Sequence, residues 1–162
     1  MDLAPTKFIV DNNVGRLAKW LRVLGFDTLF INPIADEDLL AIARREGRII
    51  VTKDTAFLRR REVMDGRLRV VFVRSNDRLG QLREVLEALK LPAPDRWFSR
   101  CLECNSPLNP AAKPEVAQQV PPYVYATQED FRRCPSCGRV YWPGTHWERM
   151  RAELQTVMAG TE

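Results

Sequence analysis

The four cysteines of the chain form two pairs with the same spacing, Cys101-Leu102-Glu103-Cys104 and Cys134-Pro135-Ser136-Cys137. Each pair places two thiolates on one tight turn, and two such turns together supply the four sulfur ligands of a tetrahedral zinc site. Because this ligand set is complete, no coordination position stays open for a substrate, and the zinc is expected to be structural. Two disulfides, or four unrelated buried cysteines, are the alternatives to this interpretation.

Three aspartates stand just beyond three apolar runs in the first ninety residues. Asp11 directly follows the first run, Asp36 begins the helix expected after the second, and Asp54 comes two residues after the third. In a parallel sheet the carboxyl ends of the strands lie at one edge, so we expect these carboxylates to converge there. Hard oxygen ligands suit Mg²⁺ or Mn²⁺, and such an ion can polarise a phosphodiester and activate a water.

The choice of Asp36 over its neighbour Asp38 rests on helix phase. Asp36 lies three and four residues before Leu39 and Leu40, so it is expected to face the sheet, whereas Asp38 is rotated away. Asp77, which follows the fourth run, is a further candidate ligand. The alternative is that these aspartates are helix N-caps, because aspartate before a helix is a common capping residue.

The elements that must position these residues alternate between strands and helices. β-rich runs at 8–10, 28–31, 48–52 and 70–73 alternate with helical patterns, which predicts a mainly parallel α/β sheet. The helices are expected at 14–24, from 36 to Gly47, after Asp54, and at 79–91. In the third of them, Phe57 and Leu58 are expected to point inward.

Beyond residue 91 prolines replace this alternation. We therefore expect a first domain at 1–92, a linker at 93–100, a zinc ribbon at 101–150, and a C-terminal helix and tail at 151–162. The terminal helical pattern itself runs from Trp147 to Met158 and is compatible with packing on either module.

Composition narrows the class of function. No apolar run is long enough to cross a bilayer, and residues 1–7 lack the apolar segment of a signal peptide, so we expect a cytoplasmic protein with reduced thiols. The single histidine, His146, excludes a nuclease that uses two histidines, and the common glycine-rich nucleotide motifs are missing. A formal net charge of +4 favours polyanionic partners only weakly.

Basic and aromatic residues supply the features expected of an RNA-binding surface. The candidates for phosphate contacts are Arg16, Lys53, Arg59, Arg60 and Arg61. Aromatic residues gather in and around the ribbon, where they can stack on unpaired bases or fill the thin core of a small zinc module. They are Trp97, Tyr123, Tyr141, Trp142 and Trp147.

Several segments resemble the Mut-seven C-terminal RNase family. They are Lys7-Phe8-Ile9-Val10-Asp11, residues 15–22, 25–28, 36–40 and 49–54, Cys134-Pro135-Ser136-Cys137-Gly138 and residues 141–147. The resemblance extends from Lys7 to about Arg151. It implies a PIN-like nuclease fold with a fused zinc ribbon, and a metal-dependent ribonuclease whose acidic positions carry over to Asp11, Asp36 and Asp54. A fourth acidic residue is also typical of PIN nucleases, and Asp77, or Asn76 in a weaker role, is available for it.

The sequence thus predicts an α/β chain: a PIN-like three-layer domain with a mainly parallel sheet, followed by a small four-cysteine zinc ribbon. The predicted function is Mg²⁺- or Mn²⁺-dependent cleavage of RNA, with Asp11, Asp36, Asp54 and Asp77 as the catalytic set. The alternative is a non-catalytic adaptor that binds RNA or the ribosome through its zinc ribbon.

Overall fold

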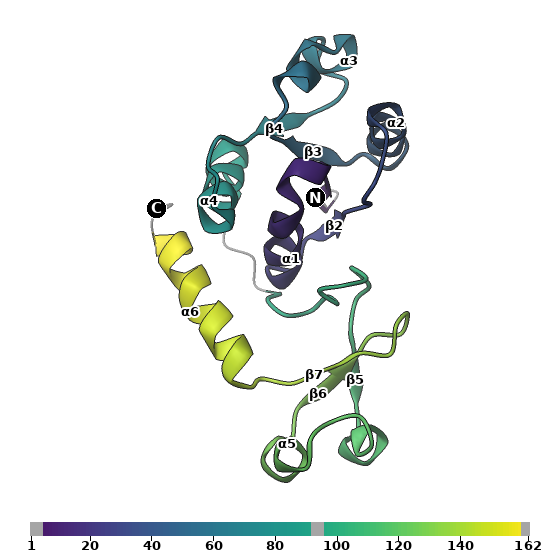
Figure 1. Cartoon of the computed structure of the whole chain (residues 1–162), viewed down its shortest axis with the longest axis vertical. Coiled ribbons are helices and arrows are strands. Elements are labelled where there is room, and N and C mark those ends of the chain that lie inside the picture. The colour runs from purple at the N-terminus through teal and green to yellow at the C-terminus, as the bar shows by residue number, and fades with distance from the viewer. Residues whose placement is uncertain (1–4, 92–95, 160–162) are drawn as a thin grey trace.

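A four-stranded parallel sheet forms the centre of the first part of the chain (Figure 1). The computed structural model describes residues 5–91 and 96–159. The strands are β1 (Lys7–Val10), β2 (Asp27–Leu29), β3 (Ile49–Thr52) and β4 (Val70–Phe72), in the spatial order β2-β1-β3-β4. All three strand pairings are parallel. The α/β class and the mainly parallel sheet predicted from the sequence are confirmed; residues 1–4, 92–95 and 160–162 of the predicted segments lie outside the described residues.

Helices cover both faces of this sheet and give it three layers. One face carries α1 (Gly15–Val23) and α4 (Arg78–Leu89), and the other carries α2 (Asp36–Glu46) and the 3₁₀ helix η2 (Thr55–Arg59). Two short elements, η1 (Asn12–Val14) and α3 (Arg61–Met64), complete this part of the chain. Successive strand residues pack alternately against the two helical layers. Phe8 packs on the α1 side and Ile9 on the α2 side. Burial on both faces explains why these strands read as continuous apolar runs.

The predicted helix boundaries hold where glycine ends a helix. Gly47 takes the left-handed conformation, with φ +67°, directly after α2, which is the usual way for a helix to stop. The third predicted helix is different, because it divides into η2 and α3 around Arg60. Phe57 is buried as expected, but Leu58 is 40% exposed, so its inward assignment is wrong. The tighter 3₁₀ turn changes the angle between successive side chains and carries Leu58 to the solvent side.

The cysteine-containing segment forms a second, antiparallel sheet. Its strands are β5 (Asn109–Ala111), β6 (Phe131–Arg133) and β7 (Val140–Tyr141), in the order β5-β6-β7. The connection from β5 to β6 contains η3 (Lys113–Val116) and α5 (Pro122–Thr127). Val116, Val124 and Phe131 form the small core under these elements. This arrangement, with its four clustered cysteines, is compatible with the predicted zinc ribbon.

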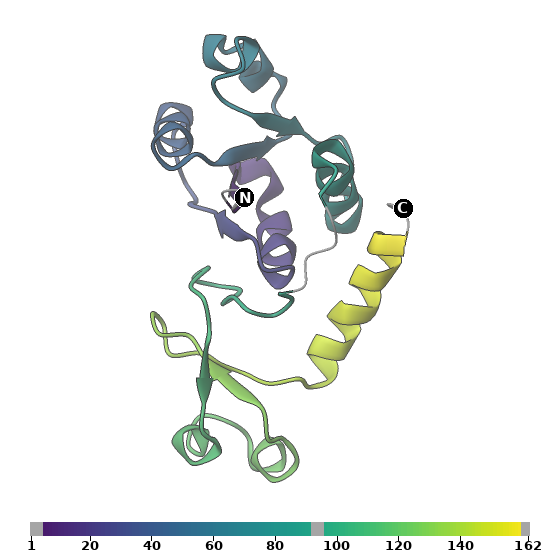
Figure 2. The ribbon, with the colours of Figure 1, turned by 180° about the vertical axis from the view of Figure 1, so that it is seen from behind.

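The final helix, α6 (Thr145–Ala159), returns to the first sheet layer and lies beside α4 (Figure 2). Trp147, Met150, Leu154 and Val157 are buried in the same core cluster as α1 and α4. Of the two packing modes that the sequence allowed, α6 therefore packs against the parallel-sheet domain. None of the helices in the described part of the chain combines the length and the apolar character needed to span a bilayer.

The turn that carries the first cysteine pair docks on the outer edge of β2. Asn105 accepts a hydrogen bond from the backbone amide of Thr28 (2.8 Å) and donates one to the carboxylate of Asp27 (2.7 Å). Arg22 of α1 donates to the carbonyl of Leu102 (2.7 Å), and both Arg22 and Asn105 are buried. These contacts fix the metal-binding turn against the amino-terminal part of the sheet.

Replacement of Asn105 is expected to loosen this junction. Asn105→Ala leaves the buried Thr28 amide without its acceptor and puts alanine at φ +72°, which together cost about 2–4 kcal/mol in the free energy of unfolding. Asn105→Gly removes the hydrogen bonds without the backbone strain, so its loss should be smaller. Urea unfolding measures both, with exposed Asn109→Ala as the control. A loss no larger than that of the control would contradict the assigned role.

The stability of the same junction is expected to depend on pH through Asp27. Burial by itself raises the pKa of Asp27, but hydrogen bonds from Arg48 and Asn105 outweigh it and hold the pKa below the ordinary 3.8. A lowered pKa means that the ionised carboxylate stabilises the fold above pH 4, and that this contribution disappears as the pH falls through the folded-state pKa. Unfolding measured from pH 6 down to about 2 should show a smaller acid-induced loss for Asp27→Asn than for the parent. Equal losses would contradict the prediction.

Candidate functional site

Asp11 occupies the carboxyl end of β1 and is only 7% exposed. Its backbone amide still donates to the Val51 carbonyl of β3 (2.9 Å), so strand pairing fixes its position. One carboxylate oxygen accepts the Asn12 amide (2.8 Å), and the other accepts the hydroxyl of Thr52 (2.7 Å). Among the residues that the structure describes, no basic side chain lies within ion-pair distance of Asp11.

Thr52 links the ends of β1 and β3. Its fully buried hydroxyl donates to Asp11 and accepts the backbone amide of Asp54 (2.9 Å), so one side chain positions two of the predicted site residues. Thr52 was not among the residues predicted from the sequence. The sequence feature that points to Thr52 is a polar residue at the last position of a buried strand, because a buried hydroxyl needs a hydrogen-bond partner.

Asp54 and Asp77 both act as helix N-caps. Asp54 accepts the Ala56 amide (2.9 Å) through one oxygen, and within the described residues its second oxygen makes no hydrogen bond. Asp77 uses both oxygens at the start of α4, for the amides of Leu79 and Gly80 (3.1 Å each). Asp11 likewise caps η1 through the Asn12 amide. The capping alternative therefore describes Asp77 completely, and Asp11 and Asp54 in part.

Asp36 does not face the sheet, and the helix-phase argument that favoured it is wrong. It is the first residue of α2 and is exposed, as is Asp38. The first turn of α2 is exposed, and burial begins only at Leu39 and Leu40. In the same turn, Glu37 pairs with Arg60 (2.6 Å).

The four predicted catalytic carboxylates thus all come after strands of the parallel sheet, but they do not form one tight group. Thr52 joins the carboxylate of Asp11 to the backbone amide of Asp54, whereas Asp36 and Asp77 belong to the starts of α2 and α4. In the described part of the chain, no three of them bring ligand atoms close enough to hold one ion directly.

The predicted phosphate-binding residues have different surroundings. The Lys53 ammonium donates to the side chain of Asn76 at the same edge, and the Lys53 amide donates to Asn13 (3.3 Å). The Arg60 charge is already paired with Glu37. The remaining three are exposed and, within the described residues, have no ion-pair partner; they are Arg16, Arg59 and Arg61.

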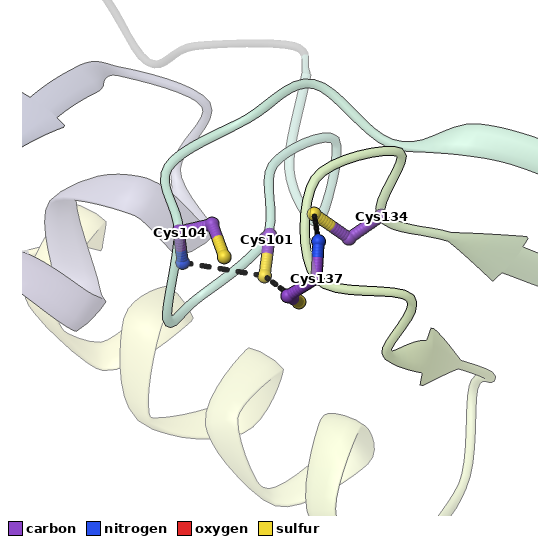
Figure 3. Close-up of side chains that lie close together, drawn as sticks. All are labelled: Cys101, Cys104, Cys134 and Cys137. Atoms are coloured by element: carbon purple, nitrogen blue, oxygen red, sulfur yellow. Dashed lines mark hydrogen bonds between the residues drawn. The ribbon is translucent and has the colours of Figure 1, made fainter.

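The four cysteines come together at the tips of two turns (Figure 3). Their sulfur atoms all lie within 4.8 Å of one another, which is the arrangement needed to bind a metal ion such as Zn²⁺. Each turn closes with an amide that donates to the carbonyl of its first cysteine, from Asn105 to Cys101 and from Gly138 to Cys134 (2.9 Å each). Asn105 and Gly138 both have positive φ, which these tight turns require.

Further hydrogen bonds organise the sulfurs. The amides of Cys104 and Cys137 donate to the sulfurs of Cys101 and Cys134, respectively (3.4 Å each). The Tyr141 hydroxyl lies 3.2 Å from the Cys101 sulfur and accepts the Leu102 amide (3.2 Å). Such contacts around ligand atoms orient them and favour the thiolate form.

Without a metal, the pKa values of the Cys104 and Cys137 thiols differ widely. A hydrogen bond with Cys137, followed by burial, raises the pKa of Cys104 to about 12. A backbone hydrogen bond from Arg139 outweighs burial and lowers the pKa of Cys137 to about 6. A metal ion must therefore displace protons from this group, which makes its binding dependent on pH.

The model of the Mut7-C RNAse domain family matches residues 6–154, which include both the parallel sheet and the cysteine turns. Neither the curated proteins nor the solved structures contain a match to the chain.

Removal of one cysteine ligand is expected to release the metal and unfold the second sheet. The purified protein should contain about one zinc per chain, and Cys134→Ser should lose it, because three sulfurs hold the ion far less tightly. Metal analysis measures the content, and hydrogen exchange should show lost protection at 109–142 but not in β1 and β3. Ser136→Ala in the same turn is the matched control. A metal-free parent protein with a folded second sheet would contradict the prediction.

Proposed function

Because the chain belongs to the Mut7-C RNAse domain family, we propose that it is a ribonuclease that cleaves RNA phosphodiester bonds with a Mg²⁺ or Mn²⁺ ion. The ion is assigned to the sheet edge formed by the ends of β1 and β3. One observation carries this assignment, namely the buried carboxylate of Asp11 that no basic side chain among the described residues neutralises.

A buried carboxylate needs compensation. Transfer of an ionised group out of water is costly unless the group is paired or coordinates a metal. At Asp11 the structure provides one amide and one hydroxyl, which are hydrogen-bond donors without a full charge. A divalent cation supplies the missing charge, and this supports a metal site better than a purely structural role.

The donor set fits Mg²⁺ without a tight group of four carboxylates. Mg²⁺ usually keeps several waters and takes one or two carboxylates together with substrate phosphates. In this proposal Asp11 binds the ion directly, Asp54 contributes its free oxygen, and the exposed Asp36 acts through water. Asp77 has both oxygens engaged with α4 and is left as a structural cap. When bound, the ion would polarise the phosphodiester and activate the attacking water.

The remaining residues of this chain would position the substrate. Lys53, held by Asn76, lies at the proposed metal edge and is assigned to a phosphate next to the scissile bond. Arg16, Arg59 and Arg61 have uncommitted charges that can contact further phosphates. The cysteine group would hold a structural Zn²⁺, and its need for reduced thiols supports a cytoplasmic location in this proposal.

Asp11→Asn is expected to abolish cleavage while the protein stays folded. Asparagine has nearly the same shape, but it lacks the charge that would hold the cation, so the rate should fall at least about 100-fold. Asp38→Asn, in the exposed first turn of α2, is the matched control and should cleave normally. Cleavage of labelled RNA is followed with Mg²⁺, with Mn²⁺ and with neither, and circular dichroism checks folding.

Thr52→Val adds an internal check. It removes the hydroxyl that orients Asp11 and leaves a side chain of similar size, so an intermediate loss of about 10- to 100-fold is expected. Cleavage that needs no divalent ion, or that persists in Asp11→Asn, would defeat the metal-nuclease proposal. RNA binding without cleavage in the parent would favour the non-catalytic adaptor.

A further inference from the structure

A cavity of about 300 Å³ lies between the second sheet and the start of α6. Cavities of this size are at the lower end of the range for small-ligand pockets, about 300–1,000 Å³. Its walls are mainly aromatic, and the rings come from four separate segments of the chain. The aromatic residues that line it are Phe98, Tyr123, Tyr141, Trp142 and Trp147.

Most of these rings are held in place by contacts outside the cavity. Tyr141 is fixed at its hydroxyl by the Leu102 amide and the Cys101 sulfur. Phe98 and Trp147 pack against each other with their ring centroids 4.2 Å apart. Tyr123 differs, because it is 72% exposed at the rim of the cavity. The cavity is therefore a preformed aromatic site, and one of its aromatic residues, Tyr123, is exposed on the solvent side.

The ionisable side chains that line the cavity and can carry positive charge are Arg100 and His146, and among the described residues no acidic side chain lines it. The Arg100 guanidinium also donates to the carbonyls of Gly25 and Asn105. Two more guanidinium groups flank its rings: Arg132 lies 5.4 Å from the centroid of Trp147, and Arg151 lies 5.7 Å from that of Phe98. Trp147 also carries a buried indole N–H that has no hydrogen-bond partner among the described residues. Aromatic faces with cations and no carboxylates are complementary to a flat aromatic group attached to an anionic chain.

We propose that this cavity binds one unpaired nucleobase of a single-stranded RNA. The proposal rests on the proposed function to the extent that RNA is taken as the substrate. The aromatic faces would stack on the base, with Arg100 near the adjacent phosphate. An apolar side chain of a protein partner would contact the rings equally well, but it would offer no anion to Arg100 or Arg151, which have no carboxylate partner among the described residues.

The location of the cavity makes this a distant subsite and not part of the cleavage centre. The first cysteine turn contacts the amino-terminal end of β2 through Asp27 and Thr28, whereas Asp11 and Asp54 lie beyond the carboxyl ends of β1 and β3. Figure 1 shows the second sheet and α3 at opposite ends of the molecule. A base in the cavity therefore belongs to a nucleotide well separated from the scissile bond. Only RNA long enough to reach both places gains from it.

The test measures affinity separately from cleavage. Fluorescence anisotropy with a labelled, unstructured RNA of about 12 nucleotides, without added Mg²⁺ or Mn²⁺, compares the parent with Tyr123→Ala, Tyr123→Phe and Met64→Ala. Tyr123 is exposed enough to be replaced without damage to the core, and Met64, 74% exposed on α3, is the matched control. Tyr123→Ala should weaken binding about tenfold, while Tyr123→Phe, which keeps the stacking face, and Met64→Ala should bind like the parent.

A second measurement uses the parent protein with the same RNA made abasic at one position at a time. Loss of affinity at one position, absent in Tyr123→Ala, is expected. Equal binding by parent and Tyr123→Ala, with no sensitive abasic position, would overturn the proposal and leave the cavity to a protein side chain. These outcomes are separable from the nuclease test. Base-dependent binding without cleavage would defeat only the proposed activity, and cleavage with unchanged Tyr123→Ala binding would defeat only the cavity assignment.

Discussion

The pairing of Asn105 with the edge of β2 is the interaction on which the arrangement of the two sheets depends. An edge strand has unpaired amides, and at Thr28 this chain satisfies one of them with a side-chain amide in place of another strand. Asn105 can do so because its backbone is left-handed, which also closes the turn around Cys101. One residue thereby fixes both the shape of a metal-binding turn and its position on the sheet. Arg22 and Arg100 strengthen the junction from α1 and from the turn itself.

The second sheet is held at two points. The first cysteine turn is fixed on β2 and α1, and after β7 the chain returns as α6 to the core that α1 and α4 form. The second cysteine turn meets the first through the hydroxyl groups of Ser136 and Ser106 (2.7 Å) and across the sulfur group, where Cys137 lies 3.7 Å from Cys101. A bound metal would therefore strengthen the link between the two cysteine turns. Through Tyr141, the same group also fixes one wall of the aromatic cavity.

Local sequence patterns predicted the features that depend on regular residue spacing, but they did not predict the features that depend on a single contact. Apolar runs predicted the four parallel strands, and cysteine spacing predicted the sulfur group, because burial and ligand geometry impose these patterns locally. Leu58 was misplaced because a regular α-helical phase does not hold in a 3₁₀ turn, and Asp36 was misplaced because the first turn of α2 is exposed to solvent. The roles of Thr52 and Asn105 depend on partners 41 and 77 residues away, and no local pattern records such contacts.

The distribution of charge indicates how such a protein would hold RNA. The net charge is only +4, and several arginines near α3 are neutralised by ion pairs, such as Arg44 with Glu62 and Arg67 with Asp65. Because the net charge is small, counterion release would contribute less affinity than it does in strongly basic nucleic-acid-binding proteins. Stacking does not depend on net charge and acts on any unpaired base. On the proposed function, a rigid aromatic cavity far from the carboxylates would thus compensate for a weak electrostatic field, and would favour substrates with an unpaired segment long enough to reach it.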